Sequence, residues 1–435
     1  MYTAIIIVFV LGYLVIALEH NIKINKTATA LLLGVLCWTL LIFGHQTIFP
    51  NLDTIKAYQF LSDALLEHIG EISEILFFLL GAMAIVELMD AHGGFTIITD
   101  KIKITKKAHL LWVLTLITFF LSALLDNLTT AIVMAAVLRK MVKNKNDLWL
   151  FASMMIIAAN AGGAWSPIGD ITTIMLWIGG QITALNIITH IFIPSMVAVL
   201  VPLIIFSFKM KGVIHMDHQE SMDEDEINVS HFEKYLVFYV GLGVLLFVPV
   251  FKTLTHLPPF MGILFGLSIV WILTEILHKD KEHTHKKALS ISGVLQNVDT
   301  TSILFFLGIL IAVAALQTSG HLAQLSGILD ANFESIYTVN VLIGLLSSII
   351  DNVPMVAGAM GMYSIETYPV DHPFWELLAY CAGTGGSILI IGSAAGIAIM
   401  GIFRIDFMWY LKKISLVALI SYLCGVAVYY VLNGI

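Results

Sequence analysis

The chain has 435 residues, of which 59% are hydrophobic and only 12% are charged, and its mean hydropathy is +0.93. About a quarter of the residues in a soluble domain are charged, so this composition excludes an ordinary soluble protein. The net charge of −8 excludes a basic, nucleic-acid-binding surface, and the acidic segment 217–226 is interpreted as a solvated loop. The three cysteines have no metal-binding or redox spacing, so no cofactor is expected.

Long apolar blocks follow one another along the chain, and such stretches predict membrane-spanning helices. In chain order the predicted spans are residues 2–18, 29–46, 72–91, 148–180, 186–208, 234–251, 258–277, 293–318, 374–402 and 409–432. No basic segment precedes the first span, so we expect an uncleaved helix rather than a signal peptide. The sequence therefore predicts an all-α membrane protein whose surface contacts lipid.

Two further apolar blocks, residues 108–138 and 336–363, have flanking loops of matching charge. Lysines flank the first block on both sides, whereas the loops around the second are acidic and lack Lys and Arg. Because basic loops are retained in the cytoplasm, each block begins and ends on one side of the membrane. The blocks have about 31 and about 28 residues, whereas two full crossings need about 40. Each block is therefore predicted to be a re-entrant hairpin. With this topology the chain is expected to lie in a bacterial inner membrane, with both termini on the periplasmic side.

Several motifs recur about 225 positions later in the chain. Ile75–Leu79 recurs as Ile303–Leu307, Asp126-Asn127 recurs as Asp351-Asn352, and residues 160–170 resemble residues 383–393. Each half has five spans plus a hairpin, and an odd number of spans inverts the second copy. We predict an inverted-repeat transporter with a first repeat over 1–208, an acidic cytoplasmic linker over 209–233 and a second repeat over 234–435, each repeat containing a broken helix. Such folds bind their substrate near the middle of the membrane.

Polar residues of the predicted membrane interior gather at the hairpin tips and at glycine-rich breaks within spans 148–180 and 374–402. A break frees backbone groups that lipid cannot satisfy, so it survives where it lines a cavity or binds an ion. Three carboxylates, Asp126, Asp170 and Asp351, are predicted at this depth, and we expect no Lys or Arg beside them. A buried carboxylate without a basic partner must take up a proton or a small cation, which is the competition that cation–proton exchange requires.

The predicted main carboxylates are Asp126 and Asp170, with Na⁺ bound at Asp126, Asn127, Asn160 and Asp170. The full predicted cation- and proton-binding site comprises Asp126, Asn127, Thr129, Thr130, Asn160, Ser166, Asp170, Thr172, Thr173, Asp351, Asn352, Ser387 and Ser393. In the alternative interpretation, the aspartates only cap the helices that follow them, and the threonines bond back to their own helix.

The segments Leu125–Ala131 and Asn160–Thr173 resemble the NhaD-type Na⁺/H⁺ antiporters of the ion transporter superfamily. The resemblance covers essentially the whole chain. It implies an inverted-repeat fold with two re-entrant hairpins, a homodimer with scaffold and transport domains, and an elevator movement. It also implies that Na⁺ or Li⁺ leaves the cell in exchange for protons.

Anion-transporting members of the superfamily have Ser-Asn-Thr at the hairpin tips, where this chain has Asp126-Asn127-Leu128 and Asp351-Asn352-Val353. The added carboxylates favour a cation. A Na⁺-coupled carboxylate or oxyanion carrier on the same scaffold is the alternative function. No zinc or serine–histidine arrangement indicates an enzyme.

Overall fold

The computed structural model describes residues 1–17, 19–99, 102, 104–214, 229–279, 289–333 and 335–433. Within these ranges the regular elements are helices, apart from one isolated β-bridge between Lys106 and Val213. The helices are α1 (Tyr2–Ala17), α2 (Glu19–Ile22), α3 (Lys26–Phe43), α4 (His45–Ile48), α5 (Thr54–Ala91), α6 (Thr96–Thr99), α7 (Lys107–Leu125), α8 (Asn127–Met141), α9 (Lys145–Ala164), α10 (Ile171–Ile178), α11 (Ala184–Lys209), α12 (His231–Thr255), α13 (Pro259–Leu277), α15 (Ile291–Val294), α16 (Thr300–Thr318), α17 (His321–Asn332), α18 (Ile336–Ser347), α19 (Asn352–Met362), α20 (Pro373–Gly385), α21 (Ala394–Phe403), α22 (Phe407–Tyr410) and α23 (Leu416–Asn433), with a π-helical turn at Leu411–Ser415.

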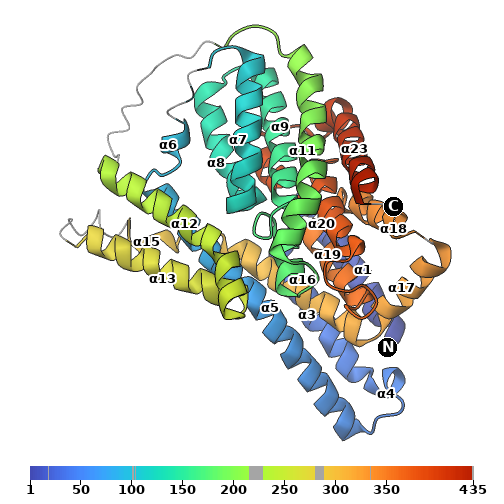
Figure 1. Ribbon diagram of the computed structural model, residues 1–435. Coiled ribbons are helices and arrows are strands. Elements are labelled where there is room, and N and C mark those ends of the chain that lie inside the picture. Colours follow the sequence, from blue (N-terminus) through green and yellow to red (C-terminus); the bar gives the residue numbers. More distant parts are fainter. Residues whose placement is uncertain are drawn as a thin grey trace.

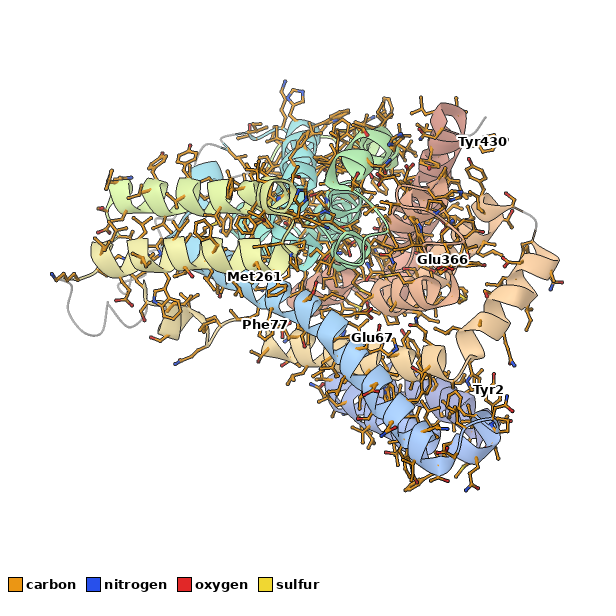
Figure 2. All side chains as sticks on the ribbon, turned by 60° about the horizontal axis from the view of Figure 1, so that its bottom comes forward. Tyr2, Glu67, Phe77, Met261, Glu366 and Tyr430 are labelled. Atoms are coloured by element: carbon orange, nitrogen blue, oxygen red, sulfur yellow. The ribbon has the colours of Figure 1, made fainter. Side chains whose placement is uncertain are left out.

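Nine of the described helices are long and apolar enough to cross a membrane. They are α3, α5, α7, α9, α11, α12, α13, α16 and the segment Phe407–Asn433. Large apolar side chains also cover the outside of the molecule. Phe77 on α5 and Met261 on α13 are 50% and 42% exposed (Figure 2), which suits a surface in contact with lipid tails. The prediction of a multi-pass, all-helical membrane protein is confirmed.

Several predicted boundaries need correction. Helix α5 begins at Thr54 rather than at residue 72, because charged residues on its exposed side ended the apolar block but do not end the helix. The predicted span 293–318 is present but begins at Thr300, because Asp299 accepts a hydrogen bond from the Ser302 N–H and caps α16 there. Helix α7 has 19 residues and can cross a membrane alone, so length does not decide whether the first hairpin is re-entrant. Helices α18 and α19 have 12 and 11 residues, each too short to cross.

The helices form two groups that meet along α5 and α16. The first group, α7 to α11 and α18 to α23, packs together in the upper and right part of Figure 1. The second group consists of α1, α3 and α4, which lie below the first, and of α12 and α13, which lie side by side on the left. Helix α3 runs alongside α16, where the indole N–H of Trp38 donates to the Ile311 carbonyl at 2.9 Å. Gly34 on α3 faces the Gly308 carbonyl, and Gly308 on α16 faces the backbone of Ala30 and Leu31, so the missing side chains let the two helices approach closely.

Candidate functional site

Two interrupted helices and two helix pairs supply the polar centre of the molecule. The interrupted helices are α9–α10, with a break at residues 165–170, and α20–α21, with a break at 386–393. The pair α7–α8 turns at Asp126 alone, whose positive φ of 74° ends one helix and begins the next. The pair α18–α19 turns at residues 348–351. All four breaks fall where the sequence places its glycines and polar residues.

Each helix pair packs against one interrupted helix through the same kind of contacts. The Ser122 hydroxyl on α7 donates to the Ala159 carbonyl at 2.5 Å, and the Ser347 hydroxyl on α18 donates to the Ala382 carbonyl at 2.9 Å. A Cβ atom at Gly162 would overlap the Phe119 carbonyl oxygen, and a Cβ at Gly385 would overlap that of Gly344. Glycine is therefore required at both positions because the backbones nearly touch.

All three aspartates of the predicted site cap the helix that follows them, as the alternative interpretation expects. Side-chain oxygens of Asp126, Asp170 and Asp351 accept hydrogen bonds from backbone N–H groups of α8, α10 and α19 at 2.8, 2.9 and 3.2 Å. The described hydrogen bonds of Asp126 are all local to this cap, because the Thr129 hydroxyl also donates to its carboxylate, at 2.8 Å. It does not account for those of Asp170.

Asp170 is 1% exposed and is the centre of a network that joins distant parts of the chain. The Asn127 side-chain amide from α8 donates to its Oδ2 at 2.6 Å, and the Asn352 amide from α19 lies 3.3 Å from both carboxylate oxygens. The Thr172 hydroxyl donates to Oδ1 at 2.9 Å. Within the described chain, no Lys or Arg forms an ion pair with Asp170 or Asp126. The described hydrogen-bond donors to the Asp170 carboxylate are therefore all neutral groups.

Asn160 on α9 extends this network to the second interrupted helix. Its Oδ1 accepts from the Asn127 amide at 3.2 Å, while its Nδ2 donates to the hydroxyls of Ser387 and Ser393 at 2.9 Å each. Ser393 occupies the position in the second half that Asp170 occupies in the first, and it caps α21 through the Gly396 N–H. The network thus gathers residues that lie more than 200 positions apart in sequence.

The other predicted hydroxyls have more local roles. The Thr173 hydroxyl donates to the Asp170 carbonyl of its own helix, as the alternative interpretation expects, and the Ser166 hydroxyl donates to the Ala123 carbonyl at 2.6 Å. The buried Thr130 hydroxyl has no hydrogen-bond partner among the described residues. Ser166 and Thr173 therefore hold the backbone around the network rather than facing Asp170.

The expectation that no basic residue approaches the three aspartates is wrong for Asp351. The Lys26 ammonium at the start of α3 lies 3.9 Å from Asp351 Oδ2. The sequence places Lys26 just outside the predicted span 29–46, but α3 begins three residues earlier and brings this side chain to the tip of the second helix pair. Asp351 is thus partly neutralised within the protein, whereas Asp170 is not.

Comparison with known proteins identifies the family of this chain. A model of the citrate transporter family matches residues 13–375. The chain belongs to this family. It is 45% identical to "Sodium/proton antiporter 1" of Arabidopsis thaliana over 99% of this chain and 73% of that protein. It is 41% identical to "Sodium/proton antiporter 2" of the same plant over 97% of this chain and 98% of that protein. "Na(+)/H(+) antiporter NhaD" of Vibrio cholerae is 30% identical over 99% of this chain and 91% of its own length. The resemblance to NhaD-type proteins of this transporter superfamily is confirmed.

For a member of this family, the polar network offers ligands that suit a small hard cation. The Asp170 carboxylate and the Thr172 hydroxyl supply oxygens, and the side-chain amides of Asn127 and Asn352, whose NH₂ groups donate to Asp170, supply oxygens when they rotate. Such oxygen donors are the ligands that hard metal ions prefer. The described residues include no cluster of three or more His, Cys, Asp or Glu side chains that could hold a metal ion. A cation here would therefore have a single carboxylate and several neutral ligands, which suits a monovalent ion.

Sequence reasoning missed four polar residues. Ser122 and Ser347 lie four residues before the Asp-Asn motifs, so their matching positions in the two halves were a usable signal. Glu376 on α20 is a buried carboxylate that accepts from Asn186 and from the Tyr429 hydroxyl, outside the Asp170 network. Lys26 gave no signal because its contact depends on where α3 begins.

Proposed function

We propose that this protein is a secondary antiporter that exchanges sodium ions for protons. The observation that carries the proposal is Asp170, a carboxylate buried among neutral amides and hydroxyls. A buried charge of this kind costs several kcal/mol unless a cation or a proton neutralises it. Na⁺ and H⁺ therefore compete for one site, and this competition couples their movements in opposite directions.

The side-chain amides beside Asp170 suit both occupants. Asn127 and Asn352 direct their NH₂ groups to the carboxylate, which stabilises its negative charge. Rotating each amide by half a turn directs its oxygen to the same place. A sodium ion bound to Asp170 needs those oxygens as ligands, and a protonated carboxyl group needs one of them as an acceptor. The same two residues thereby serve both steps of the exchange.

The names of the relatives support sodium and protons as the transported ions. Li⁺ is proposed as a second substrate because it has the same charge and the same preference for oxygen ligands. Asp126, which is only partly buried and bonded to Thr129, is proposed as a second carboxylate on the ion's path.

A Na⁺-coupled carboxylate or oxyanion carrier is the second candidate, because the matching family is described as citrate transporters. A carboxylate substrate needs positive charge or free N–H donors at its site. The Asp170 network instead has a negative charge at its centre, and its amide NH₂ groups are already engaged. This favours the antiporter.

We further propose that the two halves are inverted repeats, each with a re-entrant hairpin, and that the protein works as a homodimer by an elevator movement. The repeated Ser–carbonyl and Gly–carbonyl contacts of α7 with α9 and of α18 with α20 support the repeat. The short α18 and α19 support re-entry of the second pair. The bacterial inner membrane and periplasmic termini stay predictions, since the relatives come from both a plant and bacteria.

Reconstitution tests the function directly. Purified protein in liposomes with a trapped pH-sensitive dye is given an inward pH gradient, and lumenal pH is followed on adding NaCl, LiCl or KCl. We expect Na⁺ and Li⁺, but not K⁺, to move protons, and Asp126→Asn and Asp170→Asn to lose the response. Na⁺-driven uptake of radiolabelled citrate or succinate, without proton movement by Na⁺ alone, would establish the second candidate instead.

A further inference from the structure

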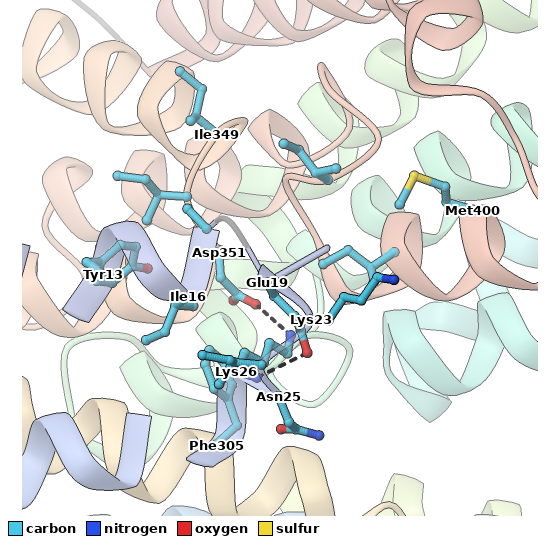
Figure 3. Close-up of a pocket in the computed structure, with 15 residues that line it drawn as sticks. Tyr13, Ile16, Glu19, Lys23, Asn25, Lys26, Phe305, Ile349, Asp351 and Met400 are labelled. Carbon is cyan, nitrogen blue, oxygen red and sulfur yellow. Dashed lines mark hydrogen bonds and ion pairs between the residues drawn. The ribbon is translucent and has the colours of Figure 1, made fainter. Parts of the chain in front are cut away.

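A cavity of about 550 Å³ lies beside the tip of the second helix pair. Its walls come from α1 and the segment that joins it to α3, from α16, from the residues before α19, and from α21 with the break before it (Figure 3). Four charged side chains line it: Glu19, Lys23, Lys26 and Asp351. Asp351 directly precedes Asn352, whose amide bonds to Asp170. The cavity therefore ends at Asp351, the neighbour in sequence of a residue that belongs to the Asp170 network.

Lys26 is held in place on several sides. Asn25 caps α3 by accepting from the Thr27 N–H at 2.8 Å, and the backbone N–H of Lys26 donates to Glu19 Oε1 at 3.0 Å. Its ammonium lies 4.5 Å from the centre of the Phe305 ring and 3.9 Å from Asp351 Oδ2. Dashed lines in Figure 3 mark its contacts with Glu19 and Asp351. The Lys26 and Asp351 side chains are only 22% and 12% exposed, so water screens their attraction weakly.

This ion pair joins the two groups of helices. Lys26 belongs to α3, which packs along α16 through Trp38 and the paired glycines. Asp351 belongs to the α18–α19 pair, which packs against α20 through Ser347. The pair therefore links the start of α3 to the tip of α19, next to Asn352.

We propose that Lys26 is a gating residue that competes with the transported cation for Asp351 at the end of this cavity. The proposal rests on the sodium–proton exchange proposed above. While the lysine ammonium is paired with Asp351, it occupies the carboxylate that an entering cation would bind. A cation that enters the cavity displaces Lys26 and continues past Asn352 to Asp170. Lys26 therefore lowers the apparent affinity for Na⁺ and keeps α19 joined to α3 until a cation arrives.

Half-saturation of Na⁺-driven proton movement in proteoliposomes tests the proposal. Lys26→Gln removes the competing charge, and we expect the half-saturating Na⁺ concentration to fall by about tenfold. Lys26→Arg keeps the charge and should remain within about threefold of the wild type. Lys23→Gln is the matched control, because it removes the same charge from the same cavity wall, and Lys23 is not paired with Asp351 among the described contacts.

A double variant separates competition from a structural effect. In the Asp351→Asn background, Lys26→Gln should leave half-saturation unchanged, because the lysine then has no carboxylate to occupy. Size-exclusion profiles in detergent report whether each variant folds. An unchanged or raised half-saturation in folded Lys26→Gln, or an equal fall in Lys23→Gln, overturns the gating role while wild-type exchange persists. Absence of exchange in the wild type overturns the proposed function itself.

Discussion

Replacing Asp170 by asparagine removes one negative charge from the polar network and changes the side-chain volume very little. Asparagine caps helices as well as aspartate does, so the start of α10 and its Thr172 N–H contact should persist. The second side-chain atom becomes an NH₂ group facing the Asn127 amide, which lies 2.6 Å from Oδ2 in the wild type. Rotation of the Asn127 amide relieves this clash. We therefore expect Asp170→Asn to fold.

The loss of charge sets the expected effect on transport. Two unit charges about 4 Å apart interact by about 4 kcal/mol at an effective dielectric constant of about 20. A loss of this size corresponds to about three powers of ten in a binding constant. Because no Lys or Arg of the described chain pairs with Asp170, no internal cation offsets this loss. The half-saturating Na⁺ concentration should rise about a thousandfold, so that no exchange is seen at the NaCl concentrations that the assay can use.

Proton movement on adding NaCl to proteoliposomes measures the effect, and Glu376→Gln provides the matched control. Glu376 is another buried carboxylate, but its partners are Asn186 at 2.9 Å, Tyr429 at 2.6 Å and the His190 ring nitrogen at 3.8 Å. Glutamine keeps an acceptor there, so we expect near wild-type half-saturation. The reasoning is refuted by folded Asp170→Asn protein that keeps half-saturation within about threefold of the wild type. It is equally refuted if Glu376→Gln loses as much as Asp170→Asn.

Three further results are expected. Gly162→Ala should lower the melting temperature in detergent and the yield of folded protein, because its Cβ overlaps the Phe119 carbonyl; Gly70→Ala, with no atom near its Cβ, should leave both unchanged or improved. Asn160→Ala removes three hydrogen bonds and should destabilise the protein by about 3 kcal/mol, measured by chemical unfolding in detergent. Burial lowers the pKa of His372, whose Nδ1 accepts the backbone N–H two residues on. The neutral His372 therefore contributes stability to the folded state above the unfolded-state pKa, and this stability is lost as pH falls through the lower folded-state pKa. The drop in melting temperature that this loss causes on acidification should occur in the wild type but not in His372→Asn.

The membrane spans could be predicted from the sequence because crossing a membrane requires a continuous apolar run. The predicted spans 186–208 and 258–277 agree with α11 and α13 within two residues at each end. Polar residues interrupt such runs only where something compensates them. For this reason the Asp-Asn motifs and the glycine-rich breaks stood out, and Asp170, Asn127, Asn160, Asn352, Ser387 and Ser393 do meet in one network.

Hydropathy and repeated motifs thus determined by themselves the membrane class, most helix positions and the residues at the polar centre, because each of these follows from short stretches of chain. The tertiary structure alone decided which of the three aspartates has a basic partner. Asp126, Asp170 and Asp351 are alike in sequence, each beginning a helix, yet Asp351 lies beside a lysine 325 positions away in the chain, whereas neutral amides enclose Asp170. The charge around a buried carboxylate is a sum over neighbours in space, and no local pattern encodes that sum.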